Sequence, residues 1–481
     1  MSRKYRLLLI NPQNQYRTGF ALTVTSRYPP ISLGILASLT PDNWEIQILD
    51  ENFNKFEETE DNNPDLVGIT SFSPNVYRAY QIAAHYRKKG IPVVLGGNHA
   101  TMASGEAAQY VDVVFKGEAE TEWATLIRDF ENNQLKNVYE GGRPSLEKMP
   151  PARHDLFHKD YIFSSIQTTR GCPFKCEFCS VHAFNGTKHR LRPAADILDE
   201  MEQMPSDFLF IVDDNFYGYS TKSKEHAYEI MEGMIKRGIK KQWFTQASIN
   251  IADDDKFLKL AAKSGCREVF IGVESDDLEQ LKSANKLLNA RITPEKFKKK
   301  FRKIQKAGIA VLGAFIFGLD GDTKESIHRR ARFIQKSGVD SIQTALLMPP
   351  PGTGLFDRMK REGRMRENNF PEDWQKYHSA EVVLDPDKMT AEELQHEMYI
   401  IWHKLYNKTA MRKRFLRTLW HTKNFKAALW AYVGNWHYRR IVFEMGGYDP
   451  DKHPDKQERI FREPGTHKII EAPAHMMSHY R

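Results

Sequence analysis

Three cysteines near the middle of the chain form the most chemically specific pattern in the sequence. Cys172, Cys176 and Cys179 stand in the run Thr-Arg-Gly-Cys-Pro-Phe-Lys-Cys-Glu-Phe-Cys, with the spacing C-x3-C-x2-C, and only Cys266 is added elsewhere in 481 residues. Thiolates are the usual protein ligands of iron–sulfur clusters, and a cubane cluster contains four irons. Three thiolates therefore leave one iron open to a ligand that is not protein.

Two structural alternatives compete with this interpretation. A zinc site closes its tetrahedron with four Cys or His ligands, usually in two spaced pairs. His182 and His189 lie close enough downstream to complete a Cys3His site. A disulfide framework is disfavoured, because three clustered cysteines cannot pair among themselves and four cysteines are sparse for a chain of this length.

The cysteine run resembles the loop of the radical S-adenosylmethionine (SAM) superfamily, in which SAM chelates the fourth iron through its amino and carboxylate groups. The Arg-Gly pair before Cys172, and Phe178 beside the third cysteine, fit that loop better than a zinc knuckle. The resemblance therefore implies a 4Fe-4S cluster and SAM as cofactors.

The bulk composition indicates a soluble globular protein of two or three domains. Hydrophobic residues make up 41% of the chain, and the mean hydropathy is −0.58. No stretch approaches the roughly 18 to 20 apolar residues of a membrane-spanning helix, and the apolar start is too short for a signal peptide. Few cysteines, an oxygen-sensitive cluster and no export signal predict a reducing, cytoplasmic location.

The positive charge is concentrated in one segment. The formal net charge is +8, yet residues 398–443 contain no Asp or Glu and contribute +10, so the rest of the chain sums to −2. A local excess of this kind indicates a local partner. The basic residues of the segment are Lys404, Lys408, Arg412, Lys413, Arg414, Arg417, Lys423, Lys426, Arg439 and Arg440.

Residues 1–140 alternate between strand and helix patterns. Such βαβ alternation predicts a doubly wound, Rossmann-like parallel sheet, whose ligands bind beyond the carboxyl ends of the strands. The predicted strands are Arg6–Asn11, Glu45–Asp50, Leu66–Ser71, Pro92–Leu95 and Val111–Phe115, with helices beginning at Ile31 and spanning Val76–Lys89.

After a Pro- and Gly-containing linker at 141–158, residues 159–370 carry a second βα series. Six repeats predict a partial (β/α)6 barrel with its active site at the C-terminal strand ends. Residues 371–481 predict a helical, basic and aromatic extension with a polar tail after Gly446-Gly447. The predicted barrel strands are Ser165–Thr168, Phe208–Val212, Trp243–Ala247, Val269–Val273, Val311–Phe317 and Ser341–Leu347.

Polar residues follow successive barrel strands in the order used by radical SAM enzymes. By resemblance, Asp213-Asp214 meets the SAM amino group, Gln246 follows the third strand, and Glu274-Ser275 touches the ribose. Gly318 belongs to a segment that resembles the adenine-contacting G-x-I-x-G-x-x-E, with Asp320 or Asp322 as its final acid. The structural alternative for each residue is a turn or a helix cap. Cys266, before the fourth strand, is expected to be a packed core thiol.

The first domain resembles the cobalamin-binding domains that precede radical SAM barrels. The resemblance rests on three loops, which contain Thr70 and Ser71, then Gly96, Gly97 and His99, then Gly117 and Glu118. Many such domains place a cobalt-ligating His after the first strand, but residues 11–16 contain none. The resemblance thus implies cobalamin without a protein imidazole below cobalt, or a domain kept only as scaffold. His99 is expected to form hydrogen bonds and not to bind cobalt.

The basic C-terminal segment leaves two main alternatives open. Met411, Phe415 and Leu419 share one helical face, as do Phe425, Ala428 or Leu429, Tyr432 and Trp436. Such helices either pack on the barrel with a solvated basic face, or rest on an anionic membrane and guide a lipid-like substrate. Nucleic acid is not an expected partner.

Over nearly its whole length the chain is similar to cobalamin-dependent radical SAM enzymes, and most similar to the branch of hopanoid C-methylases and bacteriochlorophyll-modifying enzymes. The resemblance implies methylation of an unactivated carbon in a small hydrophobic substrate, lipid or tetrapyrrole-like, with electrons from a reductant such as flavodoxin or ferredoxin. The alternatives are radical cyclisation, carbon–carbon bond formation or rearrangement without methyl transfer, and a sensing scaffold without turnover.

Overall fold

The computed structural model describes residues 4–16, 27–54, 56, 63–443 and the strand residues 461–462 and 469–470. Its N-terminal domain contains a six-stranded, fully parallel sheet in the order β2-β1-β3-β4-β5-β6. Strand β1, which lies between β2 and β3, buries Leu7–Ile10 on both faces, as a parallel strand covered by helices must. The bounds are β1 Tyr5–Asn11, β2 Trp44–Asp50, β3 Leu66–Thr70, β4 Val93–Gly96, β5 Val113–Gly117 and β6 Val138–Gly142.

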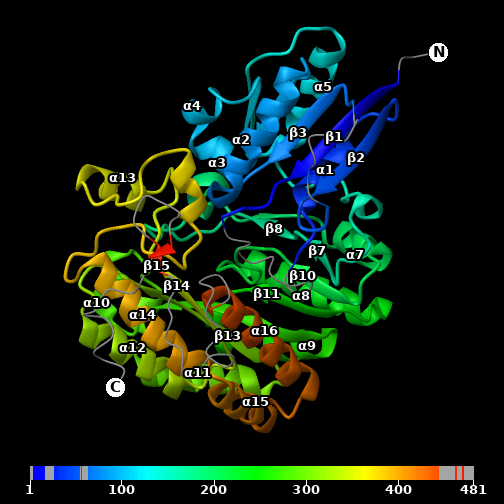
Figure 1. The fold of residues 1–481 in the computed structure, drawn as a ribbon. Coiled ribbons are helices and arrows are strands. Elements are labelled where there is room, and N and C mark those ends of the chain that lie inside the picture. Colours follow the sequence, from blue (N-terminus) through cyan, green and yellow to red (C-terminus); the bar gives the residue numbers. More distant parts are fainter. Residues whose placement is uncertain are drawn as a thin grey trace.

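Helices cover both faces of this sheet (Figure 1). They are α1 Ile31–Leu39, α2 Ser73–Lys88, the short α3 Asn98–Met102 and α4 Ser104–Ala107, and α5 Trp123–Glu131. The five predicted strands are present, and β6 is a sixth that the sequence pattern did not reveal. It ends at Gly142, beyond the position where the linker was expected to begin.

The second domain is built on another six-stranded parallel sheet in the order β14-β13-β12-β11-β10-β7. Neighbouring strands follow one another along the chain, and β7 and β14 are the two ends of the order, as expected for an open partial barrel. The predicted fold class is therefore confirmed. The strands are β7 Phe163–Ile166, β10 Phe208–Ile211, β11 Gln242–Gln246, β12 Cys266–Glu274, β13 Ala310–Phe317 and β14 Ser341–Leu346.

Helices on the outer face of the barrel bury one side of each strand. They are α7 Ala194–Gln203, α8 Thr221–Arg237, α9 Asp255–Ser264, α11 Pro294–Lys306 and α12 Lys324–Ser337. The α12 helix begins with a capping box in which Thr323 and Ser326 satisfy each other's backbone N–H groups. Cys266 opens β12 and is fully buried, which confirms the expected core thiol.

The chain after β14 returns to the N-terminal domain before it forms the predicted helical extension. Trp374, Tyr377 and Val383 share a buried cluster with residues of α2, and α13 (Gly354–Arg361) lies beside the same domain (Figure 1). The extension then comprises α14 Ala391–Tyr406, α15 Lys408–Thr422 and α16 Phe425–Phe443. No helix within the described ranges is both long and apolar enough to cross a membrane.

The predicted polar tail lies outside the described residues, apart from β15 (Phe461–Arg462) and β16 (Ile469–Ile470), which pair antiparallel. Because the loops after β5 and after β7 contact each other through side chains of Glu118 and Arg170, the carboxyl ends of the two sheets face one another. Ligands of parallel sheets bind at such edges, so the interface between the domains is where a site is expected.

Candidate active site

The cysteine loop begins after a short strand, β8 (Thr169–Arg170), which pairs with β9 (Arg190–Leu191) and thereby closes the loop at its base. Gly171 adopts φ +92°, and a Cβ there would lie 2.4 Å from the carbonyl oxygen of Lys188. Only glycine fits this approach without moving the backbone. The next residue, Cys172, donates its backbone N–H to the carbonyl of Gly186 at 3.2 Å. The local backbone thus fixes where the first thiol stands.

The three thiols lie in a largely enclosed environment. Cys176 is buried, and Cys172 and Cys179 are half-buried. Burial raises the pKa of each thiol, that of Cys179 to about 12. The Lys286 ammonium opposes this effect at all three thiols. Thiolates bind iron, so metal binding must displace protons here.

Lys286 was not among the predicted site residues. Its Nζ lies 2.9 Å from Oε1 of Glu274, at the end of β12. Burial lowers the pKa of Lys286, but Glu274 and Cys176 outweigh that effect and hold it above its usual range. Glu274 has φ +68°, a left-handed conformation that costs a non-glycine residue about 1–3 kcal/mol. This strained residue therefore places a partly buried ion pair beside Cys176.

The two aspartates after β10 occupy different environments. Asp213 is fully buried, and its carboxylate accepts the backbone N–H of Thr168 at 2.7 Å and the hydroxyl of Thr169 at 2.8 Å. Asp213 therefore anchors the chain between β7 and the cysteines. Burial, followed by the charge of Asp213, raises the pKa of Asp214 to about 7. Asp214 in turn raises the pKa of Cys172, which places this carboxyl near the thiols.

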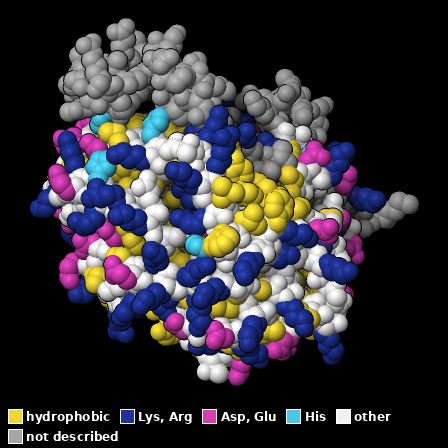
Figure 2. All heavy atoms as spheres, turned by 90° about the horizontal axis from the view of Figure 1, so that it is seen from below, with side chains coloured by type: hydrophobic (Ala, Val, Ile, Leu, Met, Phe, Trp, Pro, Cys, Tyr) yellow, Lys and Arg dark blue, Asp and Glu magenta, His cyan; other side chains and the backbone are white. Residues whose placement is uncertain are grey.

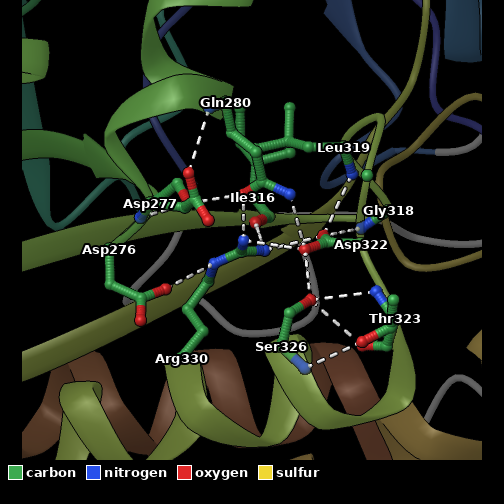
Figure 3. A network of polar contacts seen from close by, with 12 residues as sticks. Asp276, Asp277, Gln280, Ile316, Gly318, Leu319, Asp322, Thr323, Ser326 and Arg330 are labelled. Atoms are coloured by element: carbon green, nitrogen blue, oxygen red, sulfur yellow. Dashed lines mark hydrogen bonds and ion pairs between the residues drawn. The ribbon is translucent and has the colours of Figure 1, made fainter.

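A buried network shapes the loop after β13 (Figure 3). Oδ2 of Asp322 accepts the backbone N–H groups of Gly318 and Leu319 at 3.0 and 3.1 Å. Arg330 of α12 is fully buried and meets both oxygens of Asp322 at 2.8 Å. The acid that closes this loop is thus Asp322. Asp320 instead lies 2.7 Å from Arg358 and 2.8 Å from Arg364.

The same network reaches the loop after β12. Gln280, on α10 (Leu278–Ser283), donates to Asp322 at 2.8 Å and accepts the hydroxyl of Ser275 at 2.7 Å. The side chain of Gln280 therefore connects two predicted site segments: it bonds Ser275 directly and reaches Gly318 through Asp322. A small recess opens beside them. Its lining comprises Glu177, Phe178, Gln280, Ser283, Ala284, Leu319, Asp320, Leu347, Leu355 and Arg358.

Gln246 ends β11, and its carbonyl accepts the backbone N–H of Phe216 at 2.9 Å. Its side chain is half-buried. Strand β11 stands between β10 and β12, so Gln246 lies between the loops that carry Asp214 and Glu274. The structure therefore gathers Phe178, Asp214, Gln246, Glu274 and Gly318 at one end of the barrel.

The loops at the edge of the N-terminal sheet are packed tightly. Gly97 has φ +94°, and a Cβ there would lie within 2.9 Å of backbone atoms of Ser71. The hydroxyl oxygen of Ser71 is buried, yet it has no hydrogen-bond partner among the described residues. Ser71 directly follows Thr70, which ends β3 and pairs with Gly96 at the end of the neighbouring strand β4. A buried orphan oxygen of this kind is a place where a ligand can complete the hydrogen bonding.

His99 and Glu118, also predicted here, contact protein groups. His99 is fully buried, with Nδ1 2.9 Å from the Ser73 hydroxyl and Nε2 3.2 Å from Glu106. Both ring nitrogens are thus engaged, as a hydrogen-bonding role requires. Glu118, after Gly117, lies 2.7 Å from Arg170 and from Arg190. Burial raises the pKa of Glu118, but the two guanidinium groups outweigh it and hold the pKa below its usual range.

Two family models match separate stretches of the chain. The model of the radical SAM superfamily matches residues 166–334, and that of the B12 binding domain matches residues 17–127. Bacteriochlorophyllide d C-12(1)-methyltransferase of Chlorobaculum tepidum is 31% identical over 427 residues, covering 86% of this chain and 90% of that protein. The chain belongs to the cobalamin-dependent radical SAM enzymes. Its predicted family and enzyme class are confirmed.

The chain is also similar to a cyclase and to a solved structure. Anaerobic magnesium-protoporphyrin IX monomethyl ester cyclase of Cereibacter sphaeroides is 26% identical over 460 residues, covering 84% of this chain and 70% of that protein. The structure of the methyltransferase TsrM from Kitasatospora setae, with cobalamin and a [4Fe-4S] cluster, has a TM-score of 0.64 at 18% identity, covering 85% of this chain and 90% of that chain. The predicted two-domain fold therefore has a solved counterpart.

The cofactors of the enzyme are a 4Fe-4S cluster, SAM and cobalamin, in keeping with its two domain types. The residues present fit the cluster, because three thiols converge from one glycine-fixed loop. Within the described ranges, no three His, Cys, Asp or Glu side chains gather around a single metal ion. A cubane cluster gives each thiolate its own iron, so its cysteines stand farther apart than ligands of one ion. Of the two histidines considered for zinc, His189 bonds Ser223 at 2.8 Å.

Proposed function

We propose that this enzyme methylates an unactivated carbon of a hydrophobic substrate, lipid or tetrapyrrole-like, inside the barrel. The observation that carries the substrate class is the aromatic inner wall of the sheet. Phe210, Phe244 and Phe270 are half-buried and alternate along β10, β11 and β12 with fully buried residues such as Leu209 and Trp243. Alternate residues of a strand point to opposite faces, so the phenylalanines share the inner face.

Further aromatic groups complete this wall. The Phe210 and Phe244 rings stack with centroids 4.3 Å apart. Tyr28, which precedes α1 in the N-terminal domain, lies 4.9 Å from the Phe210 ring. Trp430 of α16 lies 5.6 Å from the Phe244 ring. An apolar, aromatic lining suits a hydrophobic ligand and excludes water from reactive species.

The cofactors supply hydrogen abstraction and methyl transfer when bound, and the protein positions and shields them. In this proposal, Cys172, Cys176 and Cys179 hold the cluster. Asp214 accepts the SAM ammonium, because Asp213 is already committed to Thr168 and Thr169. Phe178 and the Gly318–Leu319 backbone border the adenine, beside the recess between α10 and α13.

We propose that the loops after β3, β4 and β5 contact cobalamin. Ser71 offers a hydroxyl that has no partner among the described residues, and Gly96 and Gly97 carry no side chain that would block close approach. Glu118 positions the interface through Arg170 and does not reach the ligand. No His occurs in the residues that follow β1, so we propose that cobalt is bound without a protein imidazole. A flavodoxin- or ferredoxin-like reductant supplies the electron.

Radical cyclisation without methyl transfer is the second candidate, favoured by the similarity to the cyclase of Cereibacter sphaeroides. The mass of the product separates the two. Methylation replaces one hydrogen with a methyl group and yields both 5′-deoxyadenosine and S-adenosylhomocysteine. Cyclisation yields 5′-deoxyadenosine alone. The deciding experiment compares lipids and tetrapyrroles of cells with and without the gene; a methylated compound that disappears with the gene supports the proposal.

A further inference from the structure

The hairpin of α15 and α16 exposes an apolar stripe to solvent. Leu416 and Trp420 lie four residues apart on α15 and are 63% and 77% exposed. Phe425, Leu429 and Val433 follow at the same spacing on α16 and are 59%, 44% and 39% exposed. Residues four apart share one face of a helix, so each helix presents a continuous stripe.

The stripe lies on the side of α16 that faces away from the barrel. The packing side is formed by Ala427, Ala428 and Ala431, which are fully buried, and Asn435 donates to the carbonyl of Asp340 at 2.8 Å. Of the residues predicted to share one face of this helix, Ala428 is buried against the barrel, whereas Phe425 and Leu429 are exposed. Because α16 is apolar on both sides, covering one side leaves the other exposed.

Basic side chains border this stripe. Arg412, Lys413, Lys423 and Lys426 are exposed, and no acid occurs in residues 398–443. The neighbouring helix α11 adds seven basic residues against one acid, Glu295. Figure 2 shows hydrophobic side chains gathered on this side of the molecule, with Lys and Arg around them. We call the five apolar residues and these four basic ones the α15–α16 face.

We propose that the α15–α16 face binds the surface of a membrane that contains anionic lipids. Such a surface has charged headgroups outside and acyl chains beneath them. Exposed Trp and Phe rings can insert at the boundary of the acyl chains, and the neighbouring Lys and Arg side chains can pair with lipid phosphates. The absence of Asp and Glu from the segment removes repulsion by the negative leaflet. Contact is with the surface, because no helix in the described part of the chain is apolar enough to cross.

The place of the hairpin in the fold sets the orientation of the bound protein. Asn424, in the turn between the helices, donates to the carbonyl of Gly308 at 2.9 Å, just before β13 begins. The α15–α16 face therefore lies at the N-terminal end of the barrel, opposite the cysteines. Binding in this orientation leaves the cluster end open to a water-soluble reductant. The inference concerns this surface alone and does not rest on methyl transfer.

Vesicle flotation of the full-length holoprotein tests the inference. We expect binding to vesicles of phosphatidylcholine with phosphatidylglycerol, little binding to phosphatidylcholine alone, and weakening as salt rises. Each of the changes Lys423→Glu and Lys426→Glu should reduce partitioning about fivefold or more. The double variant Trp420→Ser with Phe425→Ser should reduce partitioning about tenfold or more, because it removes two aromatic rings that would be buried in the membrane.

The controls are exposed residues of the same types on the N-terminal domain. Lys88→Glu with Lys89→Glu, and Val138→Ser, should leave binding unchanged. Equal binding to neutral and anionic vesicles would overturn the inference, as would full binding by the two charge variants and the double variant. A shift from dimer to monomer in the Trp420 variant, without any vesicle binding by the wild type, would assign the face to a second copy instead. If the apolar variant unfolds early, the charge variants decide alone.

Discussion

The Glu118 carboxylate lies 2.7 Å from the Arg170 guanidinium, and both side chains are almost fully buried. Glu118 follows β5 of the cobalamin domain, whereas Arg170 stands two residues before Cys172. Glu120 binds the same guanidinium at 2.6 Å, and Arg190 binds Glu118 from β9. The loop that carries the cysteines is thus anchored in the neighbouring domain.

Replacing Glu118 by Gln should therefore destabilise the protein strongly. In this variant, the carboxylate of Glu120 remains beside Arg170, and both Arg170 and Arg190 lose the charge of Glu118. Breaking a buried ion pair costs about 3–5 kcal/mol. We expect the urea midpoint to fall clearly. The matched control is Glu279→Gln, which breaks the exposed pair with Lys282 and should cost less than about 1 kcal/mol. Equal shifts in the two variants would refute the anchoring role.

Cys176→Ala should abolish the cluster. Its thiol is one of three proposed ligands, so iron and sulfide per chain should drop and reductant-dependent 5′-deoxyadenosine should disappear. Cys266→Ala serves as the control because this fully buried thiol opens β12, at the other end of that strand from Glu274. It should keep its iron while losing some stability to the cavity. Iron loss in the Cys266 variant would contradict the assignment.

Asp322→Ala should weaken SAM binding. The carboxylate holds the Gly318 and Leu319 N–H groups and neutralises buried Arg330 (Figure 3). Its removal frees the loop that borders the proposed adenine site. We expect at least a tenfold rise in the dissociation constant of SAM, measured on the holoprotein by equilibrium dialysis. Asp385→Ala, at an exposed surface pair with Arg366, should leave SAM affinity unchanged. An unchanged constant in the Asp322 variant would remove this loop from the site.

Glu268 predicts a dependence of stability on pH. Burial raises the pKa of this β12 carboxyl from 4.5 to about 8, a hydrogen bond from Ser341 opposes the rise, and Asp340 adds to it. The folded state therefore holds a proton that the unfolded state releases above pH 4.5. The contribution of this proton to the free energy of unfolding is complete below pH 4.5. As the pH rises, the contribution falls by up to about 1.4 kcal/mol per pH unit, and it is lost near pH 8.

Comparison with Glu268→Gln isolates this effect from other titrating groups. The variant stays neutral, so its advantage over the wild type in urea unfolding should grow between pH 5 and about pH 8 and then level off. An advantage that is constant across this range would show that Glu268 is ionised in the folded protein.

The sequence was sufficient for features that are local in the chain. Cysteine spacing, strand alternation and the residues after each strand predicted the cluster loop and all strands of the two parallel six-stranded sheets except β6. The pairs Glu118–Arg170 and Glu274–Lys286 were not predictable, since each forms only after distant segments fold together. The sequence left open which side of α16 faces outward, because a helix that is apolar all round does not show which side meets the barrel. The sequence also did not show that Asp322 both holds the Gly318–Leu319 backbone and pairs with Arg330, because this depends on where α12 places Arg330.

The central claim is that this enzyme transfers a methyl group by radical chemistry. The most direct measurement incubates the anaerobically reconstituted protein with reductant, cobalamin, SAM carrying a CD3 group and a lipid and tetrapyrrole extract of cells that lack the gene. We predict 5′-deoxyadenosine, S-adenosylhomocysteine and an extract compound that gains one CD3 in place of hydrogen. Formation of 5′-deoxyadenosine with a product that lacks the label would contradict methyl transfer.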